Sequence, residues 1–242
     1  MMQPDPTHLL NKIGSTHPLI GVYDAPDPSP FEPLVRPQPG KWACAFMFYK
    51  KWLNGETLHI TKDNFGCGGA GYWLCNKESM TREDFIKFLA EDEGLKSSQD
   101  LMNRWLDCQK PYKQNHPNLL IGPLKEDQYA YLKSITFYVN PDQLSVLMLG
   151  ANYNNAPDDP PAVIAPFGSG CGLMLALFDD LSIPQAMLGA TDIAMSQHLS
   201  PDMLAFTVTK PMFEQLCQLD DRSFLYKPFW KNLRKARGLP VM

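Results

Sequence analysis

The sequence predicts a single α+β domain whose sheet is mixed and mainly antiparallel, with several short helices. Strand-like and helix-like segments alternate, but without the regular strand–helix–strand rhythm of a parallel sheet. The strand-like segments are also short, and several are separated by loops. With 242 residues, of which 44% are hydrophobic and 20% charged, the chain can bury one core, and we treat residues 1–242 as one domain.

The strands are predicted from alternation and from bounding prolines and glycines. The clearest one spans residues 133–140, where Ile135, Phe137 and Val139 point to one face. In the strand at residues 57–61, the same alternation turns His59 toward solvent. In chain order, the expected strands cover residues 17–23, 57–61, 119–124, 133–140, 162–165, 185–190 and 203–209.

The helices are predicted from apolar residues at helical spacing and from capping residues. Asn140 followed by Pro141 combines a preferred N-cap with proline at the first helical position. The first 16 residues form an N-terminal arm, and the six prolines between residues 24 and 40 exclude a helix there. In chain order, the expected helices cover residues 8–13, 41–53, 69–75, 81–91, 99–109, 141 onward, 171–178, 210–219 and 225–237.

Charge and hydropathy exclude two classes of partner. The net charge is −4 and the only basic block is the C-terminal tail, so we expect no nucleic-acid binding and a solvated basic helix face. No signal peptide and no apolar run of about 18 to 20 residues is present, so we expect a cytoplasmic protein without a membrane span. In that reducing compartment the six cysteines are thiols or ligands rather than disulfides. Apolar helices allow a homodimer.

Two cysteines with glycine neighbours are the most informative feature of the chain. Each follows a strand-like segment and precedes an apolar, helix-like one, which allows two related halves. The first N–H groups of a helix lack internal partners and stabilise a thiolate, and glycine lets the backbone approach a ligand. These cysteines are Cys67, next to Gly66, Gly68 and Gly69, and Cys171, which follows Gly170.

Cys44 is the third member of the predicted site, because it lies in the first turn of the helix expected from residue 41. Three cysteines at three helix starts can hold an iron–sulfur cluster with one open coordination position, or another metal with a fourth ligand. The alternative is that small residues are needed there for close packing. Asp192, in the turn after the strand at residues 185–190, either binds a ligand or holds local structure.

Several of these motifs together resemble domain of unknown function family 169. The similarity runs over roughly residues 15 to 220, and the resemblance implies a cytoplasmic bacterial or archaeal protein without an established activity. It supports the three cysteines. Members often carry an arginine soon after the aspartate, a position that this chain fills with Ile193-Ala194-Met195. The motifs are Cys44, Phe65-Gly66-Cys67-Gly68-Gly69-Ala70, Asn140-Pro141, Gly168-Ser169-Gly170-Cys171 and the turn at residues 189–192.

Three functions are compatible with these residues. The first is a redox or metal-dependent protein whose site gathers Cys44, Cys67 and Cys171. The second is a small-molecule binding module without catalysis, in which the glycine-rich segments hold the ligand. The third is nucleophilic catalysis by Cys67 or Cys171, activated by His59 or His198.

Overall fold

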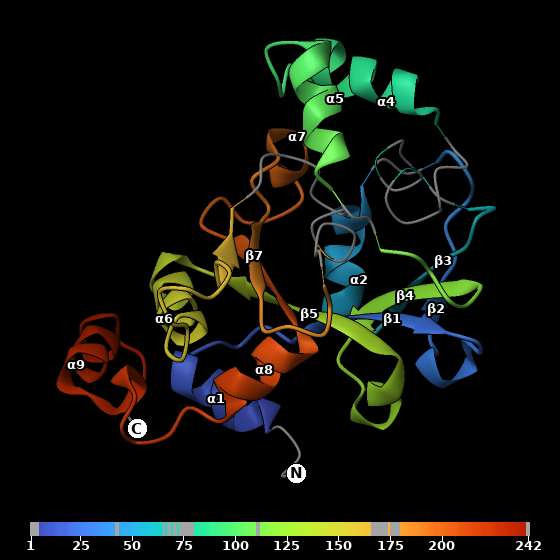
Figure 1. Ribbon diagram of the computed structural model, residues 1–242. Helices are drawn as coiled ribbons and strands as arrows, with labels where there is room; N and C mark the ends of the chain where they lie inside the picture. The colour runs from blue at the N-terminus through green and yellow to red at the C-terminus, as the bar shows by residue number, and fades with distance from the viewer. Residues whose placement is uncertain are drawn as a thin grey trace.

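The computed structural model describes residues 5–41, 44–64, 66, 69, 72, 80–109, 112–165, 174 and 180–240. Eight strands of this described part form one sheet in the order β2-β3-β4-β1-β5-β8-β7-β6, with helices on both faces (Figure 1). The edge pairs β2–β3 and β6–β7 are parallel, and the other neighbours are antiparallel. The predicted α+β fold with a mixed, mainly antiparallel sheet is therefore confirmed. The strands are β1 (Ile20–Ala25), β2 (Leu34–Val35), β3 (Thr57–Ile60), β4 (Asn118–Pro123), β5 (Leu132–Val139), β6 (Val163–Ile164), β7 (Ala186–Gly189) and β8 (Leu204–Thr209).

The sheet consists of two halves with the same topology. One half contains β1 to β4 and the other contains β5 to β8, and β1 and β5 meet at the centre of the sheet. In each half, the edge strand has two residues and pairs in parallel with the next strand inward, and the remaining neighbours are antiparallel. Leu34 pairs with Thr57, and Val163 pairs with Ala186. In both crossovers the paired residues are therefore 23 positions apart in the sequence. The topology thus supports two related halves, related by an approximate twofold axis between β1 and β5.

The match between the halves differs from the one that the glycine–cysteine segments suggest. Cys171 belongs to the β6–β7 crossover, whose counterpart is the β2–β3 crossover with Cys44. Cys67 follows β3, and the segment at the same place in the second half follows β7 and contains Asp192. Cys44 and Cys171, rather than Cys67 and Cys171, therefore occupy corresponding connections.

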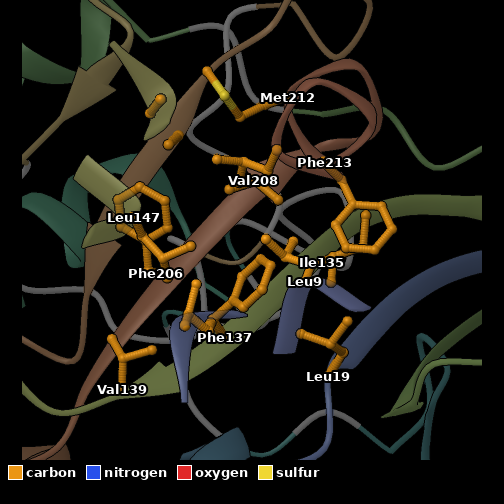
Figure 2. Close-up of a cluster of buried hydrophobic side chains, with 14 of the residues drawn as sticks. Leu9, Leu19, Ile135, Phe137, Val139, Leu147, Phe206, Val208, Met212 and Phe213 are labelled. Carbon is orange, nitrogen blue, oxygen red and sulfur yellow. The ribbon is translucent and has the colours of Figure 1, made fainter. Parts of the chain in front are cut away.

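One face of the sheet is covered by α1 (Pro6–Ile13), α6 (Pro141–Ala151) and α8 (Lys210–Cys217), which also contact one another. As predicted, Ile135, Phe137 and Val139 of β5 share this face and are buried beneath these helices (Figure 2). Asn140 and Gln143 form a capping box that starts α6 next to β5. We call this cluster the α6–α8 core.

The opposite face carries a second apolar cluster, which we call the α2–α5 core. It lies beneath the connections of both halves, so both faces of the sheet are buried. Among its members are Ile20, Val22, Phe46, Tyr49, Trp52, Leu58, Tyr72, Phe85, Met102, Tyr138, Met174 and Met187. Its helical segments are η2 (Ala45–Phe48), α2 (Tyr49–Leu53), α4 (Arg82–Lys87), η3 (Phe88–Asp92), α5 (Gln99–Asp107) and α7 (Ile193–Ser196). Three further 3₁₀ segments of the described chain are η1 (Ser29–Phe31), η4 (Glu126–Tyr131) and η6 (Phe224–Tyr226).

Two expectations about the first half are wrong. Cys44 does not lie in a helical turn: its backbone is extended (φ −145°, ψ 140°), and the 3₁₀ turn η2 begins at the next residue. His59 does not face solvent but is only 7% exposed, and its Nε2 lies 2.8 Å from Asn118 Oδ1 on β4. A buried hydrogen-bond partner explains why a polar residue occupies this position.

The two ends of the described chain pack together through α9 (Pro228–Ala236) and α1. The indole N–H of Trp230 donates to Lys12 O at 2.8 Å. The Arg234 guanidinium donates to Asn11 O and Lys12 O at 2.8 and 2.9 Å, and Arg234 is only 4% exposed. The basic tail is therefore not simply a solvated face, because Arg234 binds the last carbonyls of α1, where the helix dipole favours a cation.

Replacing Arg234 with methionine is expected to lower the free energy of unfolding by about 2 kcal/mol. The change removes two charge-assisted hydrogen bonds from a buried site but keeps an aliphatic chain there. Lys235→Met is the matched control, since it removes the same charge from an exposed position of α9 and should change the free energy by less than about 0.5 kcal/mol. Urea unfolding followed by tryptophan fluorescence measures both, and equal effects would contradict the buried role of Arg234.

Candidate functional site

The structure places some of the predicted site residues and leaves others outside the described residues. The residues outside the described part of the chain are Cys67, Gly68, Gly170 and Cys171. Those that the structure places are Cys44, Gly66, Gly69 and Asp192.

Cys44 lies at the edge of the α2–α5 core. It is half-buried and packs against the core from the position just before η2. The next residues, Ala45 and Phe46, are buried, so the chain passes at Cys44 from the accessible part of the molecule into the core. The Cys44 side chain is therefore backed by apolar side chains of the α2–α5 core.

Aromatic rings from η2, α2 and β5 meet directly behind Cys44. The ring centroids of Tyr49 and Tyr138 are 4.6 Å apart, and the Phe46 ring meets the Tyr138 ring edge-on at 6.0 Å. Trp52 approaches Tyr138 at 6.3 Å. The crossover of the first half thus covers a tyrosine from the central strand of the second half, so this part of the molecule depends on both halves.

The Tyr138 hydroxyl is buried and has no hydrogen-bond partner among the described residues. Its side chain is 1% exposed. Burial holds the pKa of Tyr138 well above its usual value, and the neighbouring Tyr49 and Cys44 raise this pKa further. The hydroxyl therefore keeps its proton at neutral pH and is available as a donor.

Tyr49 extends this group toward the surface. Its hydroxyl is hydrogen-bonded to His17 Nδ1 at 3.0 Å, with the donor set by the histidine tautomer. Burial raises the pKa of Tyr49 to about 12. Burial also lowers the pKa of His17, an effect that the carboxylate of Asp202 opposes. We call His17, Cys44, Tyr49 and Tyr138 the Cys44 cluster.

Tyr72 and Met174 tie the two glycine–cysteine segments to the same face of the sheet. Tyr72 is 2% exposed and stacks on Phe85 of α4 with ring centroids 4.2 Å apart. Met174 is 1% exposed, and its carbonyl accepts a hydrogen bond from the Ser134 hydroxyl on β5. Both side chains belong to the α2–α5 core, against which Cys44 packs.

Asp192 has a different setting from Cys44. It is half-buried before α7, and its carbonyl accepts hydrogen bonds from the N–H and hydroxyl of Ser196 at 3.2 and 3.0 Å. Its carboxylate lies near Glu93, whose pKa is raised by burial and then by Asp192. Ala190, two residues before Asp192, is buried with φ 62°, a left-handed conformation that costs a non-glycine residue about 1 kcal/mol.

Asp24, which sequence reasoning missed, is a fully buried carboxylate at the end of β1. It accepts hydrogen bonds from the Tyr112 hydroxyl and from the backbone N–H groups of Asn115 and His116, at 2.7 and 2.8 Å for the latter two. These three donors satisfy it, so we assign it the structural role of holding residues 112–116 against the sheet. Its only sequence signal is a charge at the end of an apolar strand.

Within the described residues, no group of three or more His, Cys, Asp or Glu side chains is arranged to hold a metal ion. Those residues include only Cys44 of the three predicted cysteine ligands. Among the described helices, none combines the length and the apolar character that crossing a bilayer requires.

The model of the family described as DUF169, uncharacterised ArCR, matches residues 9–218 of the 242. No curated protein and no solved structure matches the chain.

Folding stability is expected to fall with pH below about 6.5 through His17. Its pKa is lowered in the folded state, so below the unfolded value of about 6.5 the unfolded chain binds a proton that the folded chain does not. The contribution of neutral His17 to the free energy of unfolding is therefore fully present above pH 6.5. It is lost as the pH falls toward the pKa of His17 in the folded protein. His17→Gln should reduce the loss between pH 7.5 and 5, measured by urea unfolding. The exposed His8, changed to Gln, controls for removal of a histidine, and equal slopes in both variants would contradict the role of His17.

Proposed function

Because the chain belongs to the uncharacterised DUF169 family, we propose its function from its own residues. We propose a cytoplasmic redox protein that holds an iron–sulfur cluster, or another metal, at Cys44, Cys67 and Cys171. Cysteine thiolates are the usual ligands of such clusters, and a reducing compartment keeps them available.

The observation that carries this proposal is the meeting of three chain segments in the α2–α5 core. Cys44 packs against this core, and Tyr72 and Met174 are buried in it. Cys67 is five residues from Tyr72, and Cys171 is three residues from Met174. Since consecutive Cα atoms are about 3.8 Å apart, these anchors limit how far each cysteine can lie from the core. The anchors therefore favour a shared site.

The surroundings of Cys44 fit the cysteine ligation that we propose. Its thiol lies at the rim of an aromatic wall formed by Phe46, Tyr49, Trp52 and Tyr138. Such a wall excludes water on one side and lowers the local dielectric, which are two of the factors that set a cluster's reduction potential. A bound cluster would supply one-electron transfer, and three cysteine ligands would leave one coordination position for an exchangeable ligand.

Anaerobically purified protein is expected to contain iron and acid-labile sulfide in similar amounts. Cys44→Ser, Cys67→Ser and Cys171→Ser should each lower the iron content severalfold, because serine is a poor substitute for a thiolate ligand. Cys108→Ser is the matched control: Cys108 is exposed at the end of α5 and should leave the content unchanged. Iron, sulfide and zinc analysis, together with the visible absorption spectrum, measures the result.

Two outcomes would contradict the proposal. One is a protein without iron or any other stoichiometric metal after anaerobic purification. The other is a metal content that stays the same in all four cysteine variants. In either case, a thermal shift caused by small carboxylates and unaffected by the cysteine changes would favour the alternative function, a small-molecule binding module without catalysis.

A further inference from the structure

The buried hydroxyl of Tyr138 needs an explanation that the fold alone does not supply. A hydroxyl taken out of water without a hydrogen-bond partner destabilises the folded protein, and nearly all such groups in proteins find a partner. Here the ring lies among Phe46, Tyr49 and Trp52, while the hydroxyl has no partner among the described residues. Phenylalanine would fill the same space without this cost.

The other half of the sheet shows what a buried polar group at the corresponding position does when it has partners. Tyr138 pairs with the second residue of β8, and Asp24 pairs with the second residue of β4, so the two occupy corresponding sites. Asp24 receives three hydrogen bonds from the connection between β3 and β4. That connection covers residues 61–117, whereas the one between β7 and β8 covers only residues 190–203. The residues that donate hydrogen bonds to Asp24 thus belong to the longer connection, and the corresponding connection near Tyr138 is much shorter.

We propose that the Tyr138 hydroxyl donates a hydrogen bond to an anionic acceptor atom of a ligand bound beside Cys44. The inference rests on the proposed function insofar as Cys44 belongs to a ligand-holding site. The acceptor is a sulfide of an iron–sulfur cluster or a carboxylate oxygen of a small organic ligand, and both accept without carrying a proton.

The local geometry supports this role for Tyr138. Its ring is held by aromatic neighbours on several sides, so the hydroxyl is fixed before a ligand arrives. Cys44 lies two residues before Phe46, whose ring contacts Tyr138. A tyrosine phenol carries its proton at neutral pH, so it acts as a donor to an anion rather than as a competing negative charge.

Tyr138→Phe is expected to raise the melting temperature of the ligand-free protein by a few degrees, because it removes a buried donor without a partner. Tyr23→Phe is the matched control on the opposite face of the sheet. Tyr23 is equally buried, but its hydroxyl accepts from Lys125 N at 2.7 Å and donates to Pro123 O at 3.5 Å. Its loss should lower the melting temperature. Calorimetry of the full chain after metal chelation measures both.

Two ligand experiments identify the source of the acceptor. In the first, wild-type and Tyr138→Phe proteins are loaded anaerobically with Fe²⁺ and sulfide, and the reduction potential is measured. Loss of a hydrogen bond to cluster sulfide should make the potential more negative at unchanged iron content. In the second, acetate is titrated into the metal-free proteins, and a carboxylate acceptor predicts at least about tenfold weaker binding by Tyr138→Phe.

The outcomes separate this inference from the proposed function. If wild-type protein binds neither iron nor another metal but acetate binding depends on Tyr138, the metal proposal fails and the donor role of Tyr138 stands. If iron binds and neither the potential nor acetate binding changes in Tyr138→Phe, the metal proposal stands and the donor role is overturned. A melting temperature that falls in Tyr138→Phe as it does in Tyr23→Phe also overturns it, because the hydroxyl then has a partner in the ligand-free protein.

Discussion

Burial of both faces of the central sheet is the constraint on which the rest of the structure depends. Apolar residues on one face are covered by α1, α6 and α8, and those on the other by the crossovers and by α4 and α5. Every polar side chain on a central strand must therefore find a partner inside the protein or in a ligand. Thr136 and Thr207 meet this requirement with each other at 2.9 Å, and Asp24 meets it with residues 112–116. Tyr138 is the exception among the described residues of β5, and it lies behind Cys44.

The difference between the two halves accounts for the hydrogen-bond partners of Asp24 and for their absence at Tyr138 among the described residues. The two halves have the same strand order and strand directions, and the paired residues of their crossovers are the same number of positions apart. The helices and loops between their strands differ greatly. The first half has α4 and α5 between β3 and β4, whereas the second half has α6 between β5 and β6.

Local sequence signals predicted much of the fold. The alternation around Phe137 and the Asn140-Pro141 pair defined β5 and the start of α6, since both depend on neighbouring residues alone. His59 was assigned to solvent because alternation identifies a polar side chain but not the distant Asn118 that satisfies it. Cys44 was assigned to a helix because apolar spacing does not distinguish an α-helical turn from an extended residue followed by a 3₁₀ turn. The donor role that we propose for Tyr138 depends on rings from η2 and α2 and on the absence of a partner among the described residues, which only the tertiary structure shows.

The equal sequence separation of 23 positions between the paired residues of the two crossovers is also relevant to the origin of the protein. An ancestor with a single set of four strands would have carried β1 at an open edge, where unpaired N–H and C=O groups recruit another strand. Two identical copies would join there antiparallel about a dyad, as β1 and β5 do today, and form a closed C₂ dimer. Fusion of two such copies places both in one chain and releases each from the need to match the other. In that history Tyr49 and Tyr138, now in contact within one molecule, descend from residues that met across a subunit interface.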